Sequence, residues 1–299
     1  RNLNMLDRLK EVYHGSFAED VMVAFGENDI PTRAAALSFY SILSVFPFVA
    51  LLVWMSTFAG STYSAKDMVL QFSTFLPHDF VELIYDEVNH RLELSGAESA
   101  WLAAFHLFLV MLSAGAALRS MMFSFREISR ADAVIGVFAI AWRSIAFVIP
   151  VLFFVFIASF LVAVISYVVI MLTGIIQSGW LVTPLLWLLV TVVLIGFLNG
   201  VYASGLIGRQ NLPIHGWLGA SVAAAMISVV TIGLSLYFQI NPVNREWYGS
   251  PGFLINVLLW FYACAACLLL GAQINAVLHC RQAGPTCVDH QESLEPDNA

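Results

Sequence analysis

The sequence has 299 residues, of which 60% are hydrophobic and only 11% are charged, and its formal net charge is −7. Soluble domains carry about 25% charged residues, so this composition excludes an ordinary soluble protein and predicts a polytopic membrane protein. The acidic balance also argues against a nucleic-acid partner, because binding to phosphates requires clustered lysine and arginine.

Residues 1–32 form a polar lead-in that we expect on the cytoplasmic side. Its apolar residues Phe17, Val21 and Phe25 recur every four residues, which predicts an amphipathic helix lying at the membrane interface. The residues before Pro31 break this helix, and an asparagine or aspartate there is expected to begin the next one, with the proline in its first turn.

The first membrane span is expected over about residues 33–60. Arg33 is the only charged residue of this stretch, which is long enough to cross a hydrocarbon core of about 30 Å. Pro47 removes a backbone donor and frees a carbonyl one turn earlier. Four hydroxyl side chains in this stretch indicate a face turned to the bundle interior: Ser38, Tyr40, Ser41 and Ser44. They either only take part in helix packing or line a route for a transported molecule.

Residues 61–99 form an acidic loop that we expect on the periplasmic side. Two runs of apolar residues at helical spacing predict a pair of amphipathic helices, with Pro77 restarting the second. Their charged faces are more typical of a solvated surface than of a cation site. The apolar faces comprise Met68, Val69, Phe72 and Leu76 in the first helix, and Val81, Ile84, Val88 and Leu92 in the second.

Five further apolar segments complete a predicted six-helix transmembrane domain over residues 33–278, with Pro150 near the start of the third span. Small residues recur every four positions on the fifth and sixth spans. Such rows let helices approach closely, either within one subunit or between two, so a homo-oligomer stays open. The segments are about 100–118, 144–172, 180–203, 214–238 and 252–278; the rows are Gly216, Ala220, Ala224 and Ser228, and Ala263, Cys267, Gly271 and Asn275.

Lysine and arginine concentrate in the lead-in, in the loops after the second and fourth spans, and at the start of the tail 279–299. Because positively charged loops remain in the cytoplasm, the predicted topology has both termini cytoplasmic. The acidic helical pair of the first loop then faces outward, and the acidic tail lies in the cytoplasm.

We expect no catalytic residue, metal or cofactor. None of the 20 Asp and Glu residues lies in a predicted span, which weighs against ion coupling by intramembrane carboxylates. No metalloprotease, P-loop or serine-hydrolase motif appears. His106 and the C-x-x-C pair Cys264 and Cys267 are more typical of packed residues than of a proton relay or a redox site. Four residues of the tail could in principle bind zinc, but their spacing fits no common zinc-site pattern. They are His279, Cys280, Cys287 and His290.

Polar residues that carry a candidate function gather toward the predicted cytoplasmic ends of the spans. Arginine binds phosphate through two parallel hydrogen bonds, so a basic vestibule there would suit an anionic headgroup. The alternative is that the arginines only anchor the helices on the cytoplasmic side. The residues are Arg33, Arg119 and Arg143, with the amides Asn199, Gln273 and Asn275.

Three stretches of the chain resemble the YihY/BrkB family of inner-membrane proteins, a group once labelled ribonuclease BN. They are RAAALSFYSILSVFPFVALL, FSTFLP and the closing block YGSPGFLINVLLWFYACAACLLLGAQINAVL. The closing block holds the family's Tyr-Gly, Trp-x-Tyr and Leu-Leu-Gly-Ala elements, which here include Tyr248, Gly249, Trp260, Tyr262 and Gly271.

The resemblance implies six transmembrane helices and a bacterial inner-membrane location. Members of this family have been associated with virulence or serum resistance and with export of envelope lipid or lipopolysaccharide. Two positions depart from the family pattern, which often has Glu at Gln273 and Asn at Arg119. The resemblance also implies a ribonuclease label, which the residues do not support, because they offer no metal cluster and no basic RNA-binding face.

We therefore expect a non-enzymatic transport protein that moves, or helps to move, an anionic amphipathic envelope molecule such as a lipid precursor across the inner membrane, with membrane lipids as partners. Arg33, Arg119 and Arg143 would attract the headgroup, while the hydroxyls of the first span and Asn199 would line the route. Two alternatives are a small-solute exporter and a structural or accessory membrane protein that transports nothing.

Overall fold

The computed structural model describes residues 17–58, 78–94, 100–129, 142, 182–203, 216–240 and 252–283. All regular secondary structure in these residues is α-helical, which confirms the predicted all-helical class. The helices are α2 (Phe17–Glu27), α3 (Ile30–Phe58), α5 (His78–Leu94), α6 (Ala100–Ser129), α8 (Val182–Ala203), α9 (Trp217–Ile240) and α11 (Gly252–Ala283).

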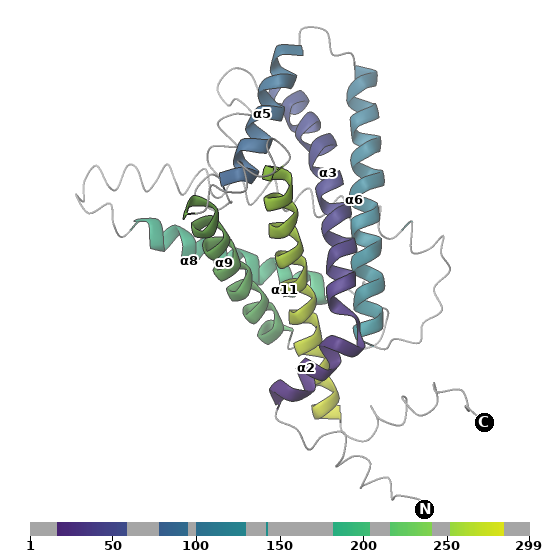
Figure 1. Ribbon diagram of the computed structural model, residues 1–299. Coiled ribbons are helices and arrows are strands. Elements are labelled where there is room, and N and C mark those ends of the chain that lie inside the picture. The colour runs from purple at the N-terminus through teal and green to yellow at the C-terminus, as the bar shows by residue number, and fades with distance from the viewer. Residues whose placement is uncertain are drawn as a thin grey trace, which may run out of the picture.

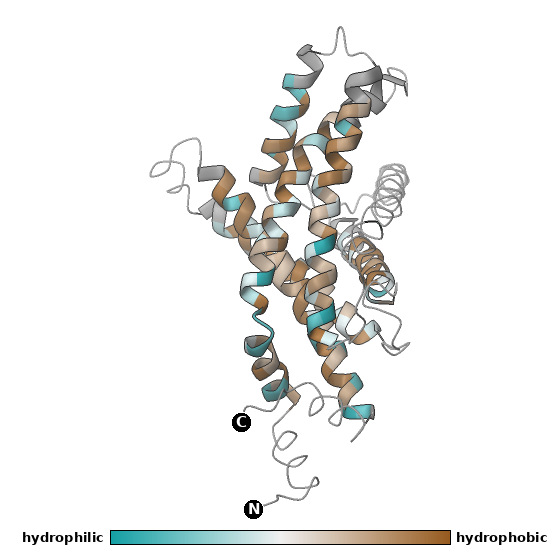
Figure 2. Ribbon diagram, turned by 90° about the vertical axis from the view of Figure 1, so that its right-hand side faces the viewer, coloured by the Kyte–Doolittle hydropathy of each residue, from teal (hydrophilic) through white to brown (hydrophobic). Residues whose placement is uncertain are grey.

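Four of these helices are long and apolar enough to cross a membrane: α3, α6, α9 and α11. A fifth helix, α8, has a shorter apolar stretch over Trp187–Ala203. Figure 2 shows apolar residues along most of the bundle, with hydrophilic residues more frequent toward its two ends. The chain is therefore a multi-pass membrane protein, as its composition predicts.

The long helices stand side by side in a bundle (Figure 1). Helix α3 packs along α6 on one side and α11 on the other, and α11 also packs on α9, which contacts α8. Helix α5 leans on α3 and α11 at the end opposite to the two chain termini, whereas α2 crosses α11 near those termini. Helix α11 thus occupies the centre of the described bundle.

Helix α2 is the amphipathic lead-in helix that the four-residue spacing predicts. Its Val21 is buried with Ile274 and Val277 of α11. The chain then turns at Asn28 and Asp29, where Asp29 has a positive φ of 47°. Aspartate tolerates this left-handed conformation better than most residues because its short side chain bonds locally. Helix α3 therefore begins at Ile30, just before Pro31, close to the expected start.

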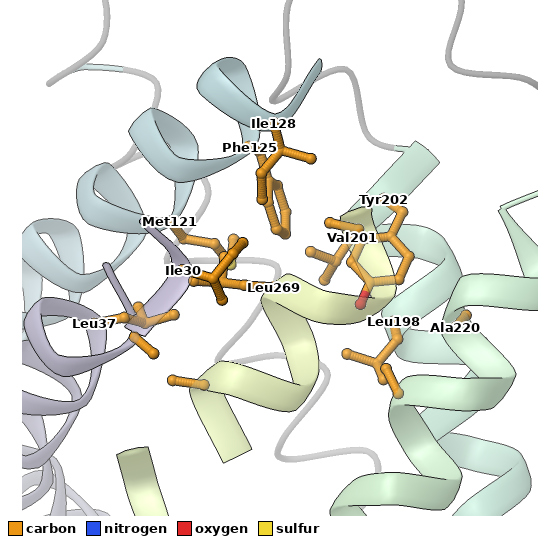
Figure 3. Packing of buried hydrophobic residues seen from close by; sticks show 14 of the residues in the cluster. Ile30, Leu37, Met121, Phe125, Ile128, Leu198, Val201, Tyr202, Ala220 and Leu269 are labelled. Carbon is orange, nitrogen blue, oxygen red and sulfur yellow. The ribbon is translucent and has the colours of Figure 1, made fainter. Parts of the chain in front are cut away.

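The main hydrophobic core lies where α11 meets the other four apolar helices. Figure 3 shows Ile30, Phe125 and Leu198 converging on Leu269 of α11 from different helices. Ala220, Ala223 and Ala224 of α9 are fully buried in the same core. The small-residue rows predicted on the fifth and sixth spans are therefore used within one subunit, where they let α9 and α11 approach closely.

Helix α5 corresponds to the second helix of the predicted outward pair. Its Val88 is buried against Val49 of α3, with Val81 and Ile84 packed beside them. Phe80 and Leu83 of the same helix form a further apolar cluster with α11. The charged residues Asp86 and His90 are exposed, so α5 has the amphipathic character that its sequence predicts.

Helix α6 differs from its prediction in length. The expected span stops at Leu118, before Arg119, whereas the helix continues to Ser129. Residues beyond the arginine explain the extension, because Met122, Phe125 and Ile128 are buried in the main core at helical spacing. The arginine ends a hydropathy run but not the helix, and Arg119 therefore lies within α6 rather than in a loop.

Several predicted features lie outside the described residues. These are the third span at about 144–172 with Pro150, the first helix of the outward pair, Pro77, the Tyr248 and Gly249 element, Arg143, the terminal part of the lead-in and most of the tail.

Candidate functional site

The polar residues expected in one vestibule separate into distinct groups. Asn275 lies with Asn199 at the start of α9, whereas Gln273 lies with Arg33 at the turn between α2 and α3. Arg119 stands apart on α6. The groups differ in what their polar atoms contact, and this difference determines which of them is available to a ligand.

Asn275 of α11 closes the N-terminus of α9. The backbone N–H of Gly219 donates to Asn275 Oδ1 at 2.8 Å, and Asn275 Nδ2 donates to the carbonyl of Gly216 at 3.1 Å. Free N–H groups in the first turn of a helix are usually satisfied by a polar side chain at the preceding residue. Gly216 has no side chain, so Asn275 supplies the missing acceptor from a distant part of the chain.

The glycines around this cap are required by the close crossing of α9 and α11. A Cβ placed on Gly219 would lie 2.1 Å from the carbonyl oxygen of Gly271. A Cβ on Gly271 would meet the hydroxyl of Tyr202 at 2.6 Å and Ala223 Cβ at 2.7 Å. The hydroxyl of Tyr202 in turn donates to the carbonyl of Leu268 at 2.7 Å. The amides, the glycines and this tyrosine therefore form a tightly packed joint.

Asn199 belongs to the same joint. Its Oδ1 lies 3.0 Å from the position that a Cβ on Gly216 would occupy, and the amide of Asn275 lies 3.8 Å from that position. The structure thus brings Asn199 and Asn275 together at the N-terminus of α9, where backbone groups of that helix already bond to both the oxygen and the nitrogen of the Asn275 amide.

A second group ties the α2–α3 turn to α11 and α6. Asn28 Nδ2 donates to Gln273 Oε1 at 2.6 Å, and both residues are buried. Arg33 Nε donates to the carbonyl of Asn28 at 2.7 Å, and Arg33 also pairs with Glu127 of α6 at 3.7 Å. Asn28 and Glu127 are not among the predicted site residues. The sequence pattern does not identify these two residues, because their contacts depend on which residues of distant helices face the α2–α3 turn.

The hydroxyls of α3 bond within their own helix. Ser38 donates to the carbonyl of Ala35 at 2.8 Å, Ser41 to that of Leu37 at 2.8 Å, and Ser44 to that of Ser41 at 2.6 Å. This pattern satisfies the donors locally and leaves the hydroxyl oxygens as acceptors.

Two other residues singled out on α3 lie close to these serines. Tyr40 packs against Phe39, with ring centroids 5.5 Å apart, and its side chain is exposed rather than turned into the core. The helix continues through Pro47 to Phe58.

Arg119 lies inside the apolar part of α6. The candidate membrane segment of this helix runs from Ala104 to Ser129, so Arg119 lies about 15 Å from its end at a rise of 1.5 Å per residue. Its side chain is half-buried. In the part of the chain that the structure describes, no hydrogen bond or ion pair joins Arg119 to another residue. Its guanidinium group, with five donors and no acceptor, is therefore open to an anionic ligand.

Two other residues singled out in the closing block, Trp260 and Tyr262, serve packing. Trp260 Nε1 donates to Thr231 Oγ1 of α9 at 3.1 Å, and its ring lies 5.0 Å from that of Phe80 of α5. Tyr262 is partly buried against the main core. These contacts join α11 to α9 and to the amphipathic helix α5.

Across the described ranges, no group of three or more His, Cys, Asp or Glu residues is placed to hold a metal ion. Cys264 and Cys267 are free thiols within α11. The chemistry that the described site offers is therefore hydrogen bonding and charge attraction, chiefly from arginine.

Comparison with known proteins gives a consistent result over most of the chain. A family model described as Virulence factor BrkB matches residues 21–293. The putative ribonuclease-like protein YfkH of Bacillus subtilis is 20% identical over 279 residues, covering 90% of this chain and 98% of that protein.

Two further relatives match over a short segment. The UPF0761 membrane proteins VP0125 of Vibrio parahaemolyticus and PBPRA3489 of Photobacterium profundum are each 34% identical over 64 residues, which is 21% of this chain and 20% of each relative. No solved structure shows a significant match.

Proposed function

Because the chain belongs to the Virulence factor BrkB family of proteins, we propose that it transports, or helps to export, an anionic amphipathic envelope molecule across the bacterial inner membrane. A lipid or a lipopolysaccharide precursor has the required chemistry. The membrane location is supported by the apolar helices and by the relatives named as membrane proteins. The substrate class rests on arginine chemistry.

The proposed topology has six spans and both termini in the cytoplasm. Its support is the charge distribution along the bundle. Arg33, Arg126 and Arg281 belong to helix segments at the end where the termini lie, whereas α5 at the opposite end carries a single lysine or arginine, Arg91. Such a separation of charge is what the positive-inside rule predicts for a protein with cytoplasmic termini.

The observation that carries the proposal is the position of Arg119. An arginine within a membrane span is costly unless it meets water, a counter-charge or a ligand. Arg33 is already held by the carbonyl of Asn28 and by Glu127, whereas Arg119 has no such contact among the described residues. We assign Arg119 the role of attracting the headgroup into the apolar part of the protein.

A non-enzymatic role is part of the proposal. The name ribonuclease-like belongs to the Bacillus relative. The sequence has no motif for metal-dependent hydrolysis and no cluster of lysine and arginine suited to RNA, so we do not extend that name to this chain.

The test is a lipid-translocation assay in vesicles containing the purified protein and fluorescent phosphatidylglycerol. Arg119→Gln removes the charge but keeps a polar side chain of similar length. We expect it to slow translocation by about tenfold or more, because the loss of one hydrogen bond to a charged group costs about 1.5–3 kcal/mol. Arg119→Lys is the matched control and should retain most of the rate.

Equal rates for the wild-type protein, Arg119→Gln and Arg119→Lys would contradict the arginine mechanism. Absence of translocation by the wild-type protein would favour the accessory-protein alternative. Movement of small soluble anions without lipid movement would favour the small-solute exporter.

A further inference from the structure

One side of α6 faces away from the main core and is largely apolar. Its four large apolar residues are 46% to 57% exposed, although the opposite side of the same helix buries Val110, Met121 and Ile128 almost completely. The exposed residues follow one another at intervals of three, four and eleven, which are close to whole numbers of helical turns, and therefore share one face: Phe105, Phe108, Leu112 and Phe123.

Arg119 and Arg126 continue the same stripe. They are seven residues apart, so they lie on one face about 10 Å from each other along the helix. Arg126 is near the end of α6 and half-buried, its Nε atom is buried, and it already interacts with another group. Arg119 is deeper, with the exposed Phe123 between the two arginines. We use the name α6 stripe for this face, from Phe105 to Arg126. It is about 32 Å long, close to the thickness of a hydrocarbon core.

The composition of the α6 stripe argues against a protein helix as its occupant. Helix interfaces in membranes favour small residues, as at Gly219 and Gly271, whereas this stripe carries large aromatic residues and two cations. A second copy of the chain packed face to face would also bring like charges together. An anionic amphiphile matches both features, because its chains can lie along the phenylalanines while its headgroup meets Arg119.

We propose that the α6 stripe is a binding site for one anionic phospholipid of the surrounding bilayer, with its headgroup at Arg119. This inference rests on the proposed function and locates its substrate on the outer face of the bundle. The route expected along the serines of α3 lies elsewhere, where the hydroxyl donors are used within the helix. A headgroup bound at Arg119 would lie about 15 Å from the end of α6, inside the apolar layer.

Photocrosslinking tests the site without requiring transport. Phe123 is replaced by the photoreactive analogue benzoylphenylalanine in the full-length protein, which is placed in vesicles of phosphatidylcholine containing a minor fraction of phosphatidylglycerol. Mass spectrometry of the adducts gives the ratio of the two lipids bound at that position. The control position is Val229 of α9, which is 69% exposed and has no arginine near it on its helix.

We expect the ratio of phosphatidylglycerol to phosphatidylcholine to be about fivefold higher at Phe123 than at Val229, given the usual attraction between a basic side chain and anionic lipid. Adding Arg119→Gln should reduce the ratio about fivefold, whereas Arg119→Lys, which keeps the charge but not the planar guanidinium group, should reduce it less. Equal ratios at the two positions, or a ratio unaffected by Arg119→Gln, would overturn the inference.

Failure of this site is distinguishable from failure of the proposed function. Enrichment at Phe123 in a protein that does not translocate lipid would support the site and contradict transport. Translocation without enrichment would support transport and contradict the site.

Discussion

The α9–α11 joint and the α6 stripe both place polar groups within apolar helices, but the amide and the tyrosine of the joint bond to the backbone of neighbouring helices, whereas Arg119 of the stripe does not. At the joint, Asn275 donates to and accepts from the backbone of α9, and Tyr202 donates to the backbone of α11. On the α6 stripe, Arg119 has no hydrogen bond or ion pair in the part of the chain described. Asn275 and Tyr202 therefore hold the bundle together, whereas Arg119 is available to a ligand.

The chemistry of the two side chains accounts for this difference. An amide carries both donors and acceptors, so a single backbone turn can satisfy one of each. A guanidinium group carries only donors and a full charge, which backbone carbonyls alone seldom balance within a membrane. We therefore infer that the amides of α11 stabilise the fold and that Arg119 acts on an anionic partner.

The largest expected effect is that of Gly219→Ala at the joint. The added methyl group would lie 2.1 Å from the carbonyl of Gly271, so α9 and α11 must separate. We expect a loss of about 3 kcal/mol or more in the free energy of unfolding, at the upper end of overpacking effects. Denaturant titration in mixed micelles would measure it.

The matched control is Gly233→Ala on the same helix. No atom lies within 4 Å of a Cβ placed there, and alanine favours a helix over glycine by about 1 kcal/mol. We expect its stability to be unchanged or slightly higher. Equal destabilisation by the two substitutions would show that the close crossing of α9 and α11 does not require glycine at position 219.

The next effect in size is expected from Asn275→Ala, which leaves the N–H of Gly219 without its acceptor. Losing one partner of a buried hydrogen bond costs about 1–3 kcal/mol, so we expect a decrease of about 2 kcal/mol in the free energy of unfolding. The exposed amide Gln282 of the same helix provides the control, and Gln282→Ala should have little effect. A stability equal to that of the wild-type protein would contradict the capping role.

The sequence predicts helices better than it predicts their contacts. Hydropathy locates α3, α9 and α11, and the four-residue rows on the fifth and sixth spans indicate close approach. The rows do not show that Gly219, which belongs to neither, receives the side chain of Asn275. That contact depends on how each helix is rotated about its axis, which composition and periodicity constrain only loosely.

The end of the second span illustrates the other difficulty. The prediction ends the span at Leu118 because a charged residue follows. The helix continues because Met122, Phe125 and Ile128 bury their side chains against other helices, and that gain depends on the tertiary structure. The same error hides the α6 stripe, since Arg119 and Arg126 share a face only if both belong to one helix.

A smaller effect is expected from the pair Asn28 and Gln273, which connects the α2–α3 turn to α11. A double-mutant cycle with Asn28→Ala and Gln273→Leu should give a coupling of about 1 kcal/mol, the usual net value of one buried hydrogen bond. Unfolding of the four proteins under identical conditions would measure it. Additive effects of the two substitutions would contradict the direct contact at 2.6 Å.

The smallest effect is expected from Arg281→Ala at the end of α11. Arg281 pairs with Asp20 of α2 and lies 5.4 Å above the ring of Phe17. An exposed ion pair and a surface cation–π contact each contribute up to about 1 kcal/mol. We expect a decrease of about 1 kcal/mol or less in the free energy of unfolding, shrinking as salt is added. A larger loss, or one independent of salt, would show that packing rather than charge dominates this contact.

The most direct test of the separation between the two regions is the rate of lipid translocation per folded molecule for Arg119→Gln and Asn275→Ala, measured in the same vesicles. We expect Arg119→Gln to fold normally and to lose about tenfold or more of the rate, whereas Asn275→Ala should be less stable but retain its rate per folded molecule. A normal rate for Arg119→Gln together with a lost rate for Asn275→Ala would contradict this expectation and move the functional site to the α9–α11 joint.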